Sequence, residues 1–189
     1  MDITEAFLTD MDKKLFGFLD TGAEVYEYTL KNEDAEVSII TYGAAIRKFT
    51  AFGTDIVGGY DTVEDYISDD SHQGGIIGRV ANRVADAKFT MDGKCYSLPK
   101  NDGENCLHGG NGFDRRIWSV VEYDKADEPI GYGKECITLA YSSADGEEGF
   151  PSELAVAVCY TLKGASLGIS YVAIPTGKTP ISLDRKSVV

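Results

Sequence analysis

The sequence predicts an all-β fold, an antiparallel β-sandwich, and three observations support this prediction. Hydrophobic and polar residues alternate with the two-residue period of a strand in many short segments. Turns rich in glycine separate these segments at short intervals. Only two short segments favour a helix. Many strands at such spacing, joined by tight turns, are typical of sandwiches and barrels.

The expected strands follow one another along most of the chain. The strongest hairpin pattern is the pair of strands that flanks Asp92-Gly93, because a tight primed turn needs positive φ at its centre. A longer strand-like run is interrupted at Gly43. The expected strands cover residues 24–30, 35–52, 88–91, 94–98, 117–123, 135–141, 154–162, 167–174 and 179–183.

Helices are expected in two places. Thr62 is a suitable N-cap for a short helix through Tyr66, and residues 78–84 are expected to make one or two turns. No internal repeat or low-complexity linker divides the chain, so residues 21–183 are expected to form one sandwich. Residues 1–20 are expected to be an N-terminal arm or a first short strand, and residues 184–189 a separate tail.

Charge and composition exclude several classes of function. The chain has 31 acidic and 18 basic residues and a net charge of −13, which repels nucleic acids and anionic membrane surfaces. No signal peptide or membrane-spanning segment is recognised. The four cysteines form no C-x-x-C pair, so no zinc site is expected. Free thiols in a cytoplasmic protein are favoured over a disulfide, which stays an alternative.

Polar residues interrupt the strand pattern directly after the apolar segment that begins at Gly74. Arg79, Asn82 and Arg83 stand beside Ile and Val, where a guanidinium is costly to bury unless it has a partner. The guanidinium fork and the Asn amide both present directed donors, which suit adjacent hydroxyl groups. The alternative is that both arginines form ion pairs with some of the many acidic residues.

The two histidines receive different interpretations. His108 precedes Gly109-Gly110, where the backbone can bend close to a ligand, and a neutral imidazole can bind a sugar oxygen. The alternative is a loop histidine that binds a backbone carbonyl. His72 follows Asp69, Asp70 and Ser71 and is expected to be a solvated loop residue.

Two further segments are expected to have no catalytic role. Residues 145–151 contain Asp145, Glu147 and Glu148, but they lack the ligand spacing of a calcium loop and are interpreted as an acidic turn before a strand. The glycine-rich segment at residues 74–78 is not followed by Gly-Lys-Ser/Thr, so a phosphate loop is excluded.

The chain resembles the aldose 1-epimerases, also called galactose mutarotases, through an ordered set of motifs between about residues 20 and 183. No single motif would suffice, but their order and spacing together are specific. The matching segments are Ile-Thr-Tyr-Gly-Ala at 40–44, Gly-Arg-Val-Ala-Asn-Arg-Val at 78–84, Phe-Thr-Met-Asp-Gly-Lys at 89–94, Leu-His-Gly-Gly at 107–110, Gly-Phe-Asp at 112–114, Trp118 and Asp-Gly-Glu-Glu-Gly-Phe-Pro at 145–151.

The resemblance implies a large sandwich of the galactose mutarotase type that binds a free hexose, galactose or glucose, on the concave face of one sheet. It implies that Asn82, Arg83 and His108 are substrate-binding residues, and that no metal and no organic cofactor is needed. In this family a carboxylate takes the proton of the C1 hydroxyl while an imidazolium protonates the ring oxygen. The ring then opens and closes to give the other anomer.

The resemblance covers the N-terminal half to three-fifths of such an enzyme. The family continues after residue 183 with a proton-donating His, but Lys186 stands at that position, and the family's general-base Glu lies further on. We therefore expect no catalytic residue in this chain and weak or no activity, as of a truncated fragment. The alternatives are a non-catalytic carbohydrate-binding module, a half-protein completed by another chain, and an enzyme for a different sugar.

Overall fold

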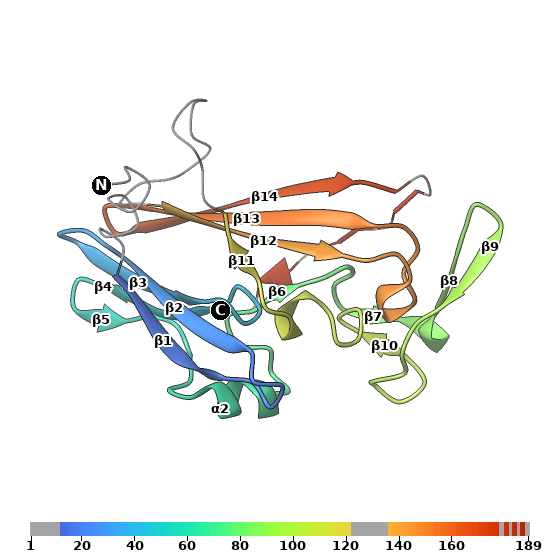
Figure 1. The fold of residues 1–189 in the computed structure, drawn as a ribbon, viewed down its shortest axis with the longest axis horizontal. Helices are drawn as coiled ribbons and strands as arrows, with labels where there is room; N and C mark the ends of the chain where they lie inside the picture. The colour runs from blue at the N-terminus through green and yellow to red at the C-terminus, as the bar shows by residue number, and fades with distance from the viewer. Residues whose placement is uncertain (1–11, 122–135, 178–179, 182, 185, 188–189) are drawn as a thin grey trace.

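The computed structural model describes residues 12–121, 136–177, 180–181, 183–184 and 186–187. Antiparallel strands in two larger sheets and three two-stranded ladders form most of the regular secondary structure of this part of the chain. Figure 1 shows the two larger sheets as two layers, one above the other. The predicted all-β sandwich is therefore confirmed.

The first layer is a five-stranded meander in which each strand pairs with its neighbour in sequence. Its strands lie in the order β1-β2-β3-β4-β5. Most apolar positions of β2 and β3 are buried, while the charged residues Glu24 and Lys31 at the ends of β2 are exposed. The strands are β1 (Asp12–Phe18), β2 (Glu24–Lys31), β3 (Ala35–Ile40), β4 (Ile46–Ala51) and β5 (Thr54–Asp55).

The second layer is a four-stranded antiparallel sheet in the order β11-β12-β13-β14. Its inner strand β13 alternates buried and half-buried residues over much of its length, and the edge strand β14 leaves Val172 and Ile174 exposed. The strands are β11 (Ser119–Val120), β12 (Cys136–Ser143), β13 (Leu154–Lys163) and β14 (Ser166–Pro175).

The main hydrophobic core lies between these two layers. Val37 and Ile39 of β3 and Leu139 and Val158 of the second sheet are fully buried in one cluster. The hydroxyl of the buried Tyr160 donates to the carbonyl of Ala44 at 2.5 Å, which ties the two layers together. Alternating strands thus bury a continuous apolar layer.

Short elements connect the layers and build the end of the molecule where the predicted site lies. Figure 1 shows β7 to β10 together at one end of the two layers, away from β1 and β5. All the short elements outside the two larger sheets are α2 (Val63–Ser68), β6 (Ile76–Ile77), β7 (Arg83–Val84), η1 (Ala85–Ala87), β8 (Lys88–Met91), β9 (Lys94–Ser97), β10 (Cys106–Leu107), η2 (Phe113–Arg115), η3 (Glu147–Gly149) and β15 (Lys186–Ser187), within the residues that the structure describes.

The two helix predictions have opposite outcomes. Helix α2 begins after Thr62, whose hydroxyl accepts the backbone N–H of Asp65 at 3.2 Å, so the predicted N-cap is confirmed. The helix predicted over residues 78–84 is wrong, because this segment is non-helical and leads into β7. Gly78 packs against the ring of Phe113, where a Cβ atom would overlap. Contacts with a distant segment thus override the local preference.

The strand predictions hold except near the end of the chain. In place of the expected strand over residues 179–183, the described residues 180, 181 and 183 have no strand structure. The backbone of β15 instead pairs with β6, with Lys186 opposite Ile77. The expected strand at 117–123 is shorter, and residues 122, 123 and 135 of the predicted strands lie outside the described residues.

Candidate functional site

The three predicted substrate-binding residues lie next to one another, although 24 residues separate Arg83 from His108. Strand β7 pairs with β10, and the register places Leu107 opposite Arg83. The backbone N–H of His108 donates to the carbonyl of Asn82 at 3.0 Å and extends this short ladder. The ladder therefore brings Asn82, Arg83 and His108 to one place.

The His108 imidazole is buried and has a defined tautomer. Its Nδ1 accepts the backbone N–H of Asn82 at 2.9 Å. Because a backbone N–H can only donate, Nδ1 has no proton, and the proton of the neutral ring is on Nε2. His108 is only 8% exposed, and its φ of +55° lies in the left-handed region that side chains rarely adopt. The alternative in which His108 binds only a backbone carbonyl does not describe this arrangement.

Arg83 lies at the surface beside Asn82. Its Nε donates to Oδ2 of Asp102 at 2.6 Å, and its Nη1 donates to Oδ1 of Asn82 at 3.4 Å. The Arg83 side chain is 56% exposed. The alternative interpretation, an ion pair with an acidic residue, is thus present for Arg83. The contacts orient the guanidinium and leave most of it accessible to a ligand.

For Arg79, the other arginine of the motif, the alternative of an ion pair with an acidic residue is not what the structure shows. It is almost fully buried, and its four side-chain hydrogen bonds all go to oxygen atoms at the end of β12 or in the segment that joins β12 to β13. Nε donates to the Ser143 hydroxyl at 2.9 Å, Nη1 to the Pro151 carbonyl at 2.8 Å, and Nη2 to the carbonyls of Ser143 and Ala144. Burial lowers the pKa of the guanidinium from its ordinary value. Arg79 therefore stabilises the fold around the site.

His72 is not the solvated loop residue that the sequence predicts. Its side chain is only 9% exposed, and Nδ1 lies 2.7 Å from Oδ2 of Asp114. Its ring meets the His108 ring edge to face, with the centroids 4.8 Å apart. The interpretation failed because the partner, Asp114, lies 42 residues away, while the neighbours of His72 in sequence are acidic and polar.

The acidic segment 145–151 is more than a turn. Glu147 accepts the hydroxyl of Tyr141 at 2.5 Å and also that of Ser143, and its Oε1 lies 3.1 Å from Nη2 of Arg116. Glu148 accepts the backbone N–H of Asn111, close to the Gly109-Gly110 turn after His108. Burial and the Glu147 hydrogen bond raise the pKa of Tyr141 to about 12. These carboxylates connect η3 to the loop that follows His108.

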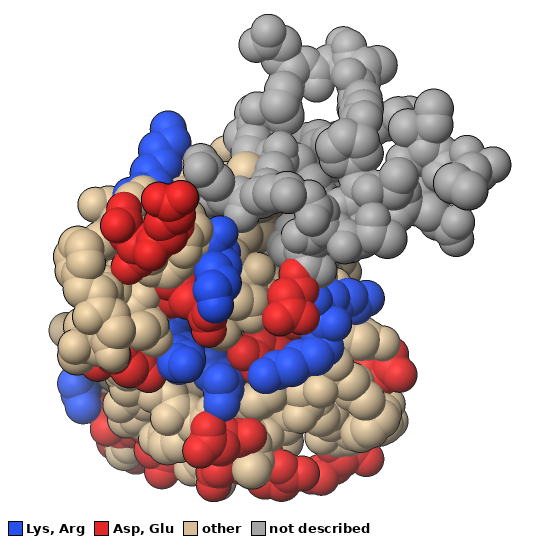
Figure 2. Space-filling model, turned by 90° about the vertical axis from the view of Figure 1, so that its left-hand side faces the viewer, with Lys and Arg blue, Asp and Glu red and all other residues tan. Residues whose placement is uncertain are grey.

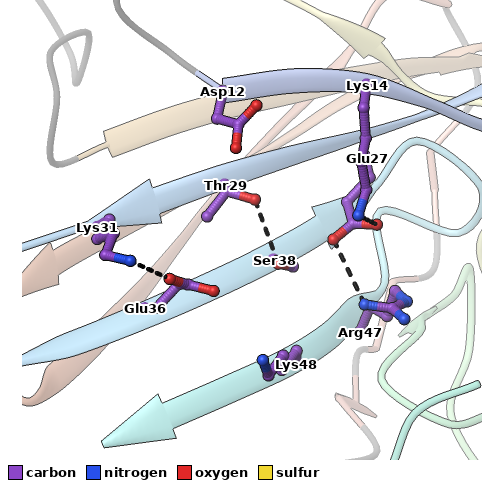
Figure 3. A pocket seen from close by; sticks show the side chains of 9 residues that line it. All are labelled: Asp12, Lys14, Glu27, Thr29, Lys31, Glu36, Ser38, Arg47 and Lys48. Carbon is purple, nitrogen blue, oxygen red and sulfur yellow. Dashed lines mark hydrogen bonds and ion pairs between the residues drawn. The ribbon is translucent and has the colours of Figure 1, made fainter.

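A polar hollow of about 320 Å³ lies elsewhere, on the outer face of the five-stranded sheet. Figure 2 shows basic and acidic side chains gathered on this side of the molecule. Figure 3 shows that Glu27 points toward both Lys14 and Arg47, at 3.1 and 3.4 Å. The lining residues are Asp12, Lys14, Glu27, Thr29, Lys31, Glu36, Ser38, Arg47 and Lys48. Most of its charges pair with one another, and none of the predicted sugar-binding residues lines it.

Three further features concern the cysteines, possible metal ligands and possible membrane spans. The four cysteines are free thiols, as the sequence favours, and three of them are buried. Within the residues that the structure describes, no group of three or more metal-ligating side chains is found. No helix in that part of the chain is long and apolar enough to cross a membrane.

Comparisons with known proteins agree with this arrangement. The aldose 1-epimerase family model matches residues 26–183. The galactose mutarotase of Bos taurus is 36% identical over 187 residues, which is 95% of this chain and 52% of that protein. The aldose 1-epimerase of Haemophilus influenzae is 36% identical over 122 residues, which is 64% of this chain and 33% of that protein.

A solved structure shows the same fold. The crystal structure of galactose 1-epimerase from Lactobacillus acidophilus superposes with a TM-score of 0.73 at 25% identity, over 87% of this chain and 48% of that one. The chain spans about half the length of the curated relatives it matches. With a family match across most of its length, the chain belongs to the aldose 1-epimerase family.

Proposed function

We propose that the chain binds a free hexose, galactose or glucose, through Asn82, Arg83 and His108, as part of an enzyme that interconverts its α and β anomers. One observation carries this proposal. The β7–β10 ladder joins the two motifs that hold these three residues, and the contact between Asn82 and His108 fixes the imidazole in one tautomer. The family match across residues 26–183 supports the reaction class.

The three side chains suit a sugar chemically. The neutral His108 ring offers an Nε2–H donor, while the guanidinium of Arg83 and the amide of Asn82 offer directed donors for adjacent hydroxyls. The anomers exchange when a base removes the C1 hydroxyl proton and an acid protonates the ring oxygen, which opens the ring to the aldehyde. Rotation about C1–C2 and the reverse proton transfers then complete the exchange.

We expect the 189 residues to bind hexose more effectively than they catalyse its anomerisation. Lys186 stands where the resemblance expects a proton-donating His, and an amine with an ordinary pKa near 10.4 is a poor donor at neutral pH. The free thiols agree with a cytoplasmic location.

Two measurements on the 189-residue chain test the proposal. Galactose binding is measured by ligand-observed NMR, and anomer exchange by polarimetry on freshly dissolved α-galactose. Arg83→Ala and His108→Ala should each weaken binding about tenfold or more, the effect of a lost hydrogen bond of about 1.4 kcal/mol. The exposed Lys88→Ala control on β8 should bind as the parent chain does. A folded chain that binds no hexose contradicts the proposal.

A second candidate is a non-catalytic carbohydrate-binding module with the same three contacts. The Lys186 substitution favours it, because the family's proton donor is replaced. Hexose binding without any acceleration of anomer exchange, in a stable monomer, would select the module. Acceleration that disappears in His108→Ala would select the enzyme. An obligate oligomer in light scattering would instead indicate a site completed by another chain.

A further inference from the structure

A buried polar pair stands directly behind the candidate sugar-binding histidine. It consists of His72 and Asp114, whose side chains are 9% and 5% exposed and whose Nδ1 and Oδ2 atoms are 2.7 Å apart. A carboxylate in this contact accepts the Nδ1 proton and thereby fixes the orientation of the His72 ring. The pair lies outside the set of residues that the family motifs assign to the sugar.

The His72 ring in turn contacts His108. The two ring centroids are 4.8 Å apart and the ring planes are nearly perpendicular, at 86°. Such an edge-to-face arrangement is a favourable geometry for aromatic rings. His108 needs support of this kind, because its backbone is in the left-handed region, which persists only where the surroundings impose it.

Packing alone does not explain why positions 72 and 114 hold a histidine and an aspartate. Two apolar side chains would fill the same space without the cost of burying a polar pair. In addition, Oδ1 of Asp114 is buried with no hydrogen-bond partner among the described residues, and the only nearby cation contact is Nε of Arg115, 3.9 Å from Oδ2. A polar pair retained at such a cost next to a candidate site indicates a functional role.

We propose that His72 is a positioning residue for His108. Asp114 orients the His72 ring, the His72 ring restricts the His108 ring, and His108 keeps the Nδ1-acceptor, Nε2–H tautomer that faces the sugar. This inference rests on the proposed hexose binding for its functional consequence. Its structural part, the effect of His72 on the His108 tautomer, does not depend on any ligand.

NMR with ¹⁵N-labelled histidine tests the inference, because the chain has only two histidines. Without sugar, the parent chain should show a single Nε2–H tautomer for His108. In His72→Ala this signal should broaden or shift to a mixture of tautomers, and galactose affinity should fall about tenfold. His72→Phe keeps a ring against His108 but loses the Asp114 contact that orients it, so it should restore the tautomer and the affinity only in part. Asp114→Asn should reproduce a weaker form of the His72→Ala effect.

The matched control is Asp69→Asn. Asp69 supports the same loop through the backbone N–H groups of Ser71 and Gln73, and these two contacts involve neither imidazole. An unchanged His108 signal in folded His72→Ala or Asp114→Asn overturns the proposal, as does an equal effect of Asp69→Asn. If the parent chain binds no galactose, the proposed function fails, but the sugar-free spectra still decide whether His72 positions His108.

Discussion

The four-stranded sheet and the loop region between His72 and Trp118 are held together in different ways. In the sheet, β12, β13 and β14 form an unbroken antiparallel ladder with apolar side chains on its inner face. In the loop region, several non-glycine residues have positive φ, and Arg79, His108 and Asp114 are buried polar groups. The sheet depends on many equivalent contacts, and the loop region depends on a few individual ones.

This difference shows where the candidate site obtains its geometry. Backbone in the left-handed region costs free energy and persists only where the surroundings impose it. In the loop region the surroundings are long-range hydrogen bonds, such as those from Arg79 to Ser143 and Pro151. In the loop region, removing a single polar group should therefore lower the free energy of unfolding strongly. In the sheet, the free energy of unfolding should fall when buried apolar volume is removed.

The largest effect is expected for Arg79→Ala. The substitution removes four hydrogen bonds and leaves the carbonyls of the buried residues Ser143 and Pro151 without this donor. The free energy of unfolding should fall by about 3–5 kcal/mol, measured by urea denaturation. Arg83→Ala is the matched control, because its ion pair with Asp102 is exposed and should contribute at most about 1 kcal/mol. Equal losses for the two arginines would contradict the comparison.

A smaller effect is expected in the sheet for Leu139→Ala. Leu139 is fully buried between the layers, so the substitution removes apolar contacts and leaves a cavity. The free energy of unfolding should fall by about 3 kcal/mol, within the range for buried leucines. Val172→Ala on the exposed edge strand β14 is the control and should change it by less than about 1 kcal/mol. A Leu139→Ala loss as small as that of the control would show that the layers are not tightly packed.

The same difference decides what the sequence can predict. The sheet strands follow a local two-residue period, and residues 154–162 and 167–174 were expected almost at the observed bounds of β13 and β14. The loop region has no such period. The helix expected over residues 78–84 fails because Phe113, some 35 residues later, packs on Gly78.

The candidate site was predictable only in part. The motifs that carry Asn82, Arg83 and His108 are recognisable in the sequence, and β7–β10 pairing brings them together. Nothing local to His72 indicates burial, since its partner Asp114 belongs to a different segment. Three of the four side-chain hydrogen bonds of Arg79 likewise go to backbone carbonyls, which no side-chain pattern can reveal.

The smallest effect concerns Tyr141, which belongs to the sheet and donates to Glu147 of η3. Glu147 in turn contacts Arg116 of the loop region. Burial and this hydrogen bond raise its pKa to about 12, from 10.0. Because the protonated form is favoured in the folded state, its contribution is fully present below pH 10 and is lost as pH rises toward 12. Tyr141→Phe should therefore lower the free energy of unfolding by at most about 1 kcal/mol at pH 7, since Ser143 and Arg116 still bind Glu147.

Urea denaturation at several pH values between 8 and about 12 checks this sign, given the ordinary tyrosine pKa near 10. The parent chain and Tyr141→Phe should differ most at the lower pH and converge as pH rises. Tyr160, whose pKa burial also raises, is present in both chains and cancels in the difference. If the difference in the free energy of unfolding stayed constant to the highest pH, the hydroxyl proton that Tyr141 donates to Glu147 would not connect the sheet to the loop region. The coupling would then rest on ring packing against Phe113 and Trp118 alone.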